Sequence, residues 1–199
     1  MHKLNITLQS GQKLWFTSDQ HFGHRNVLRF CHRPFDDIKQ MGQALIDNWN
    51  NVVNDDDICF ILGDMCWFES RHDVKKIMNK LKGKTIYVVP GNHCTRKSYE
   101  LCDERIVLLD DISAIYLRHE GCEKIFKEIF VSHMPLMTWP HRERGAINLF
   151  GHIHSGPLVT NDADQDLPLW EGLQYDVGVD NNDYTPVEID DILDELSII

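Results

Sequence analysis

Residues 86–94 read IYVVPGNHC, an apolar run that stops at a proline and a glycine and is followed by polar side chains. A short continuous apolar run bounded by turn residues is typical of a strand that is buried on both faces of a sheet. Residues 58–64, ICFILGD, repeat the arrangement, because an apolar run ends there at Gly63 and Asp64. Both stretches therefore predict buried strands that deliver polar side chains to the edge of a sheet.

Apolar residues at helical spacing predict helices between and after these strands. One helix is expected after Asp36, as its N-cap, with an apolar face made by Ile38, Met41, Leu45, Trp49 and Val52. A second helix is expected after Ser70, and a third in the closing stretch PVEIDDILDELSII, residues 186–199.

Further strands are expected on either side of this region. Residues 3–9 and 13–19 are predicted to form a hairpin about the turn Ser10-Gly11. Later apolar runs predict strands at residues 112–117, 125–132, 147–150 and 173–180. Alternating strands and helices followed by several strands predict an α/β fold, and the absence of a linker-like stretch predicts one domain over residues 1–199.

The composition is typical of a soluble globular protein, with 199 residues, 42% hydrophobic and 26% charged. No apolar stretch approaches the roughly 20 residues that span a bilayer, and the first residues lack the apolar core of a signal peptide. A cytoplasmic protein without a membrane partner is therefore expected. None of the six cysteines forms a C-x-x-C pair, which argues against a zinc knuckle or a disulfide framework.

The net charge of −11 is concentrated near the C-terminus. Residues 155–199 contain twelve Asp or Glu and no Lys or Arg, so we expect an acidic C-terminal cap within the same domain. An acidic chain binds nucleic acid poorly, because the phosphate backbone is itself negative. The charge pattern therefore favours a small phosphorylated substrate over an extended nucleic acid.

Polar residues of three types stand at the ends of the apolar runs. They are Asp19 and His21, then Asp64, then Asn92 and His93, then His133, and finally His152 and His154. In open α/β sheets, ligands bind beyond the carboxyl ends of the strands. Alternation in D-x-H and H-x-H is expected to place two side chains on one face of an extended segment.

The residue types in this set predict a metal site. A lone histidine is more often structural, but mixed imidazole and oxygen donors in such number suit Mn, Fe, Zn, Co or Ni. Seven donors are too many for one ion and suffice for two if one carboxylate bridges them, and Asp64, alone at the end of its strand, is the expected bridge. Two ions about 3.5–4 Å apart can activate water and bind phosphate oxygens.

The ordered set D-x-H, G-D, G-N-H, H and G-H-x-H resembles the calcineurin-like metallophosphoesterases, and it covers residues 19–154. The stretch FTSDQHFGHRNVLRF with the following RPFDD also resembles a small bacterial and phage-type branch of that superfamily. The resemblance implies a four-layer α-β-β-α sandwich with two central mixed β-sheets. It also implies a hydrolase of phosphate esters with two divalent ions, Mn before Fe, Zn, Ni or Co.

The resemblance further implies a role for each motif residue. Asp19, His21, Asp64 and His154 would hold the first ion, and Asp64, Asn92, His133 and His152 the second. A hydroxide between the ions would attack phosphorus, and His93 would act as the general acid. His24 and Arg25, which directly follow the first motif, are candidates for phosphate contacts.

One position departs from the family pattern, because Cys94 stands where Asp or Glu usually follows the G-N-H histidine. A carboxylate there would orient His93, whereas a thiol is a much weaker partner. Either Cys94 is simply tolerated, or it makes the site sensitive to oxidation.

Several functions stay open at this level. A phosphodiester substrate is slightly favoured over a phosphomonoester or a phosphoprotein. A non-catalytic binding or scaffold protein on the same fold is the rival from another class, although no motif ligand is missing from the chain.

Overall fold

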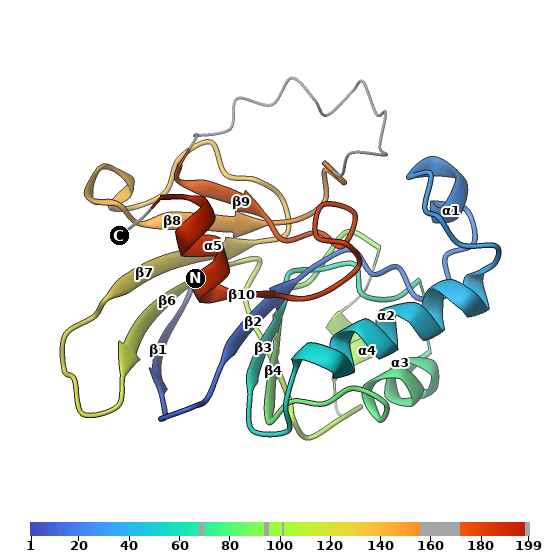
Figure 1. The fold of residues 1–199 in the computed structure, drawn as a ribbon, viewed down its shortest axis with the longest axis horizontal. Coiled ribbons are helices and arrows are strands. Elements are labelled where there is room, and N and C mark those ends of the chain that lie inside the picture. Colours follow the sequence, from blue (N-terminus) through green and yellow to red (C-terminus); the bar gives the residue numbers. More distant parts are fainter. Residues whose placement is uncertain (68–69, 94–95, 101, 156–171, 198–199) are drawn as a thin grey trace.

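The computed structural model describes residues 1–67, 70–93, 96–100, 102–155 and 172–197, which form two stacked five-stranded sheets (Figure 1). The first sheet has the order β1 (His2–Leu8), β6 (Ile112–His119), β7 (Lys127–Ser132), β8 (Ile147–Phe150) and β9 (Gln174–Asp176). The second has the order β10 (Val187–Glu188), β2 (Leu14–Thr17), β3 (Ile58–Ile61), β4 (Thr85–Val88) and β5 (Ile106–Leu108). The expected α/β sandwich of two mixed sheets is confirmed.

The helices of the described residues are short apart from one. They are α1 (Val27–Phe30), α2 (Ile38–Val52), α3 (Arg71–Met78), α4 (Arg96–Tyr99), α5 (Ile189–Glu195) and a 3₁₀ turn at Arg142–Arg144. None of these helices is both long and apolar enough to cross a membrane.

Strand direction determines where the site can form. In the second sheet β2, β3 and β4 run parallel, so the loops that follow them leave the same edge. In the first sheet β7, β8 and β9 are likewise parallel. The antiparallel pairs β6–β7 and β10–β2 make both sheets mixed.

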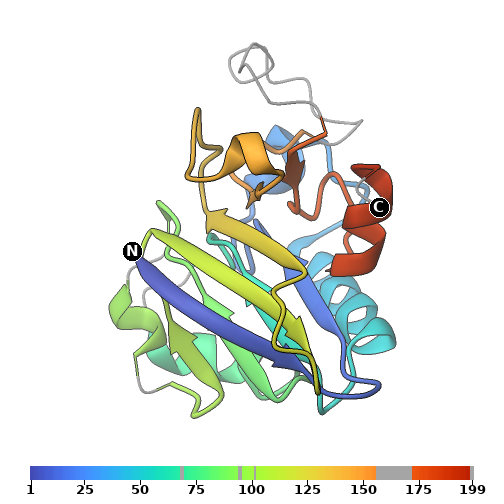
Figure 2. The same ribbon diagram turned by 90° about the vertical axis from the view of Figure 1, so that its left-hand side faces the viewer.

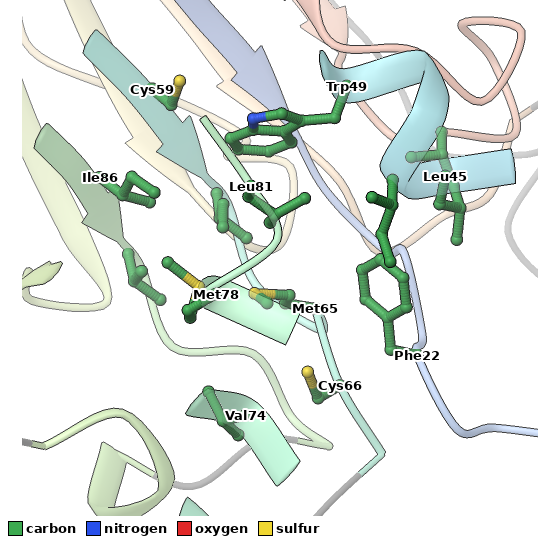
Figure 3. Close-up of a cluster of buried hydrophobic side chains, with 14 of the residues drawn as sticks. Phe22, Leu45, Trp49, Cys59, Met65, Cys66, Val74, Met78, Leu81 and Ile86 are labelled. Carbon is green, nitrogen blue, oxygen red and sulfur yellow. The ribbon is translucent and has the colours of Figure 1, made fainter. Parts of the chain in front are cut away.

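The second sheet is buried on both faces, as its continuous apolar runs predict. Phe16 and Phe60 belong to the core between the two sheets, and their rings stack at a centroid distance of 5.1 Å. Trp15, Cys59 and Ile61 alternate with them and belong to the core on the opposite face. Figure 3 shows part of this second core, in which side chains of α2 and α3 pack against the strands.

The outer face of the first sheet, seen in front in Figure 2, is covered differently. Ala114 and Phe130 on this face pack against Trp139 and Ala146, which lie in the segment between β7 and β8. That segment carries the 3₁₀ turn, so within the described residues a loop rather than an α-helix covers the part of this face around Ala114 and Phe130. Lys3, Asn5 and Thr7 of β1 are exposed.

The expected hairpin of residues 3–9 and 13–19 is wrong. β1 pairs in parallel with β6 in one sheet, whereas β2 lies between β10 and β3 in the other. All residues of β2 are buried and both of its edges are occupied, so no edge remains for β1. The turn at Ser10-Gly11 therefore carries the chain from one sheet to the other.

Two predicted boundaries also shift. The N-cap of α2 is Asp37 rather than Asp36, because the Asp37 carboxylate accepts hydrogen bonds from the backbone N–H groups of Lys39 and Gln40. The strand expected to reach Asp180 ends at Asp176, and the chain turns there.

The packing of Phe60 between the sheets can be tested by truncation. Phe60 is fully buried and stacks on both Phe16 and Tyr87. Phe60→Ala is expected to lower the free energy of unfolding by about 3–5 kcal/mol, measured by urea denaturation. Phe30→Ala is the matched control, since Phe30 is 49% exposed, and should cost less than about 1 kcal/mol. Equal losses in the two variants would contradict this description of the core.

Candidate metal centre

The carboxyl ends of both sheets meet at one place. Loops after β2, β3 and β4 carry Asp19, His21, Asp64, Asn92 and His93, and loops after β7 and β8 carry His133, His152 and His154. A parallel bridge between Ser18 and Gly178 joins the two sheets at this end. The structure therefore brings the eight predicted residues together, although they span much of the chain.

Two buried carboxylates, Asp19 and Asp64, lie at the centre of the site. One oxygen of each is held by a backbone N–H group. Asp19 Oδ2 accepts from His152 at 2.8 Å, and Asp64 Oδ1 accepts from His93 at 2.9 Å. The second oxygen of each carboxylate is thereby oriented toward the histidine rings.

The oriented oxygens face imidazole nitrogens. Asp19 Oδ1 lies 3.8 Å from Nε2 of both His21 and His154, and it has no hydrogen-bond partner among the described residues. Asp64 Oδ2 lies 3.4 Å from His133 Nε2 and 3.9 Å from His21 Nε2. Asp64 thus faces rings from both sheets.

His133 is held in the orientation expected of a metal ligand. Its Nδ1 lies 2.8 Å from the carbonyl oxygen of Leu62, which can only accept, so Nδ1 is the donor and Nε2 points into the site. Nε2 lies 2.8 Å from Asn92 Oδ1, and His152 Nδ1 lies 3.1 Å from the same oxygen. Asn92 Oδ1 can only accept, so either imidazole nitrogen can donate to it, depending on the protonation of its ring.

The electrostatics of the site favour positive charge. Burial opposes ionisation of Asp64, but the hydrogen bond and charge of His133 and the backbone N–H of His93 lower the pKa of the carboxyl group to about 2. Burial likewise opposes protonation of His133, but Asp64 and Asp19 raise its pKa above the usual value. The Asp64 carboxylate therefore stays ionised and attracts a cation.

His21 differs from the other rings because burial dominates its ionisation. Burial lowers the pKa of His21 to about 3, against the opposing charge of Asp19. The ring is consequently neutral near pH 7, as a metal ligand must be.

His154 is oriented by a buried ion pair that the sequence did not reveal. Its Nδ1 lies 2.6 Å from Asp180 Oδ2, and its Nε2 faces Asp19. Arg33, also buried, donates to both Asp180 oxygens at 2.8 and 2.7 Å, and to the carbonyl oxygens of Asp19 and Gln20. This histidine–carboxylate–guanidinium chain fixes the ring and the loop after β2 together.

The surroundings of His154 also favour a positive charge on its ring. Burial opposes its protonation, but hydrogen bonds with Asp180 and Cys31 and the charge of Asp19 raise its pKa to about 11. A proton or a metal ion can supply that positive charge. Cys31, His154 and Asp180 form a third group that could hold a metal ion, with Cys31 Sγ 3.5 Å from His154 Nδ1. This group is less suited to a metal ion, because Arg33 already donates to both Asp180 oxygens.

The expectation that D-x-H and H-x-H are extended segments is wrong. Asp19, His21, Asp64, His152 and His154 all have positive φ, between 47° and 73°. Such left-handed conformations are unfavourable for residues with a side chain and cluster at functional sites. The chain therefore curls at each strand end, and the two histidines of H-x-H serve different neighbours, His152 facing Asn92 and His154 facing Asp19.

Two glycines permit the close packing of the carboxylates. A Cβ atom on Gly91 would lie 2.5 Å from the backbone nitrogen of Asp64 and would also collide with its carboxylate. A Cβ atom on Gly151 would lie 2.5 Å from Ser18 Cβ and would collide with the Asp19 carboxylate. The glycines of G-N-H and G-H-x-H are thus required because no side chain fits at these positions, and not by turn geometry alone.

The donors fit a metal ion. Asp19, His21 and His154 each offer one atom within 4.8 Å of the others, and so do Asp19, Asp64 and His133. Asp19, whose Oδ1 has no hydrogen-bond partner among the described residues, belongs to both groups. Buried imidazole and carboxylate groups with unused lone pairs are the donors that divalent transition metals prefer.

An aromatic group borders the site next to His93. The His93 side chain is 38% exposed, and its ring lies 4.7 Å from that of Trp67. His24 stacks on Trp67 at 3.9 Å with an interplanar angle of 9°. The structure thus places His24 at the site, whereas Arg25 is exposed.

Sequence reasoning missed Asp180, Trp67 and the role of Arg33. Asp180 comes after β9, as the other acidic residues come after their strands. The sequence predicts a strand that includes Asp180, so it did not stand out as a residue at a strand end. Trp67 and Arg33 follow no metal-ligand spacing, and only packing reveals them. Cys94 and residues 156–171 of the acidic segment lie outside the described residues.

Curated proteins with similar sequences exist, although no protein-family model matches the chain. The chain is 38% identical over 85 residues to uncharacterized protein MJ1445 of Methanocaldococcus jannaschii, a match that covers 42% of this chain and about half, 48%, of that protein. It is 25% identical over 165 residues to the Gene 66 protein of Mycobacterium phage L5, covering 73% of this chain and 78% of that protein.

A solved structure supports the architecture directly. The protein of unknown function AQ665 from Aquifex aeolicus superposes with a TM-score of 0.63 and 24% identity, covering 92% of this chain and 98% of that one. The fold is shared. At this level of identity the likeness carries no statement about activity.

The orienting role of Asp180 leads to a test. Asp180→Asn removes the charge that holds His154, and we expect Mn²⁺ affinity to fall about 10- to 100-fold, measured by isothermal titration calorimetry. Asp183→Asn, an exposed change in the same turn, should leave the affinity unchanged. Unaltered affinity in Asp180→Asn, with the fold intact by circular dichroism, would show that the ion pair serves stability alone.

Proposed function

We propose that this protein is a hydrolase of phosphate esters that uses two divalent metal ions, with Mn²⁺ the first candidate and phosphodiesters the favoured substrates. The observation that carries the proposal is the pair of buried carboxylates, Asp19 and Asp64, each with one oxygen held by a backbone N–H and the other facing histidines. A structural polar cluster would satisfy Asp19 Oδ1, which has no hydrogen-bond partner among the described residues.

The ligands divide into two sets. Asp19, His21, Asp64 and His154 would hold one ion, and Asp64, Asn92, His133 and His152 the other. When bound, such ions supply Lewis acidity that activates water and neutralises phosphate oxygens. Two contacts support this division: His154 lies beside Asp19, whereas His133 and His152 both lie within hydrogen-bonding distance of Asn92.

His93 is the proposed general acid. Its ring is partly exposed and lies 3.9 Å from Asp64 Oδ2, so it borders the ligands from the solvent side. Its backbone N–H orients Asp64, which couples the position of the acid to that of the central carboxylate. The His24–Trp67 pair lies on the adjacent side, where it borders His93.

The proposal is tested by hydrolysis of two chromogenic esters. Purified protein supplied with Mn²⁺ should hydrolyse bis-p-nitrophenyl phosphate faster than p-nitrophenyl phosphate, and EDTA should abolish both activities. A p-nitrophenyl phosphate rate above that of the diester would indicate a monoesterase. Absence of turnover with Mn²⁺, Ni²⁺, Co²⁺ and Zn²⁺ would favour a binding protein on the same fold.

Separate variants distinguish the ligands from the acid. His93→Asn should lower kcat by about 10²- to 10⁴-fold while metal content, measured by plasma mass spectrometry, is unchanged. Asp64→Asn should lose bound metal as well as activity, because it removes the shared carboxylate. A His93→Asn protein with normal kcat for a poor alkoxide leaving group would reject the acid role.

A further inference from the structure

An open cavity of about 330 Å³ adjoins the second group of candidate ligands. Asn92 and His133, two of those ligands, form one wall. The remaining lining residues are mainly apolar: Pro90, Gly91, Asp111, Ile112, Ser132, Met134 and Leu136. The cavity is therefore continuous with the metal site but differs from it in character.

The apolar side chains of this cavity are unusually exposed. Ile112 is 39% exposed and Met134 is 49% exposed, and both belong to the few large apolar residues that face solvent. Apolar surface that borders a polar site is typical of ligand pockets, which combine mostly apolar walls with a few polar groups. Covering Ile112 and Met134 with an apolar group would remove this surface from water.

The polar groups of the cavity narrow the choice of ligand. The Ser132 hydroxyl donates to the Met134 carbonyl oxygen at 2.7 Å and is thus already used. Asp111 is the acidic residue of the lining, so a second phosphate or a carboxylate would be repelled. An uncharged, apolar group fits best.

The position of His93 indicates which ester group of the substrate would occupy the cavity. His93 does not line the cavity, and its ring neighbours are His21, His24 and Trp67. Since the general acid must reach the leaving oxygen, the leaving group lies on the His93 side. The ester group beside Asn92 and His133 is then the one that stays on phosphorus.

We propose that this cavity binds an uncharged apolar group retained on phosphorus, so that the substrate is a phosphodiester carrying an aryl or alkyl ester there. The inference rests on the proposed function. Water attacks phosphorus and releases a proton to the solvent, and the bond to the leaving oxygen breaks. His93 protonates that oxygen and then regains a proton from the solvent, and the monoester product keeps the apolar group. Because a cavity of about 150 Å³ holds a benzene ring, the volume suffices for an aryl group.

The test compares two diesters with the same leaving group. Phenyl p-nitrophenyl phosphate should be hydrolysed with a kcat/KM at least tenfold above that of methyl p-nitrophenyl phosphate, after correction for their uncatalysed rates. Ile112→Ala/Met134→Ala should reduce this preference below threefold. Met137→Ala is the matched control, since Met137 follows in the same loop, is 76% exposed and is not among the cavity residues.

The outcomes separate the cavity from the reaction. Turnover of both diesters with no phenyl preference, or a preference unaffected by Ile112→Ala/Met134→Ala, would overturn the cavity assignment and leave the proposed function standing. If neither diester is hydrolysed, calorimetric binding of diphenyl and dimethyl phosphate to the Mn²⁺-supplied protein decides. If diphenyl phosphate binds more tightly than dimethyl phosphate and Ile112→Ala/Met134→Ala removes the difference, the cavity assignment is supported without the proposed reaction. Equal binding of the two esters would reject the cavity assignment.

Discussion

Two carboxylates buried side by side are the constraint on which this end of the molecule depends. Asp19 and Asp64 are almost fully shielded from solvent, and the pKa of Asp64 is lowered to about 2, so negative charge is retained in a poorly hydrated place. Burying like charges is costly unless cations or hydrogen bonds compensate it. The histidines, the backbone N–H groups of His93 and His152 and, in our proposal, two metal ions provide that compensation.

The fold provides the geometry that such an arrangement requires. Parallel strands β2, β3 and β4 end at one edge, and parallel strands β7, β8 and β9 end opposite them, so ligands from both sheets converge. Gly91 and Gly151 let the backbone approach the carboxylates more closely than any side chain permits. Left-handed backbone at five ligand positions directs the side chains inward, at a cost of about 1–3 kcal/mol each. The sandwich core between the sheets offsets this strain.

The buried strands and the polar residues after them could be predicted from sequence because both depend on local patterns. Continuous apolar runs in β3 and β4 indicate burial on two faces, and Asp64 and Asn92 stand directly after them. The partner of β1 could not be predicted, because hydrogen bonding to β6 is a long-range choice that turn residues do not encode. Trp67 escaped prediction for a related reason, since only packing brings it beside His24. Asp180 escaped because the preceding strand ends at Asp176, earlier than its sequence pattern predicts.

In our proposal, the two sides of the site bind different parts of the substrate. His93, His24 and Trp67 border the side where a leaving group would depart, whereas Ile112 and Met134 border the apolar cavity beside His133. The proposed reaction depends on two bound metal ions. Anomalous diffraction at the manganese edge, from crystals grown with Mn²⁺, would locate them. Two anomalous peaks are expected, both beside Asp64, with one also next to Asp19, His21 and His154 and the other next to Asn92, His133 and His152. A single peak away from Asp64, or no peak, would rule out the dinuclear site.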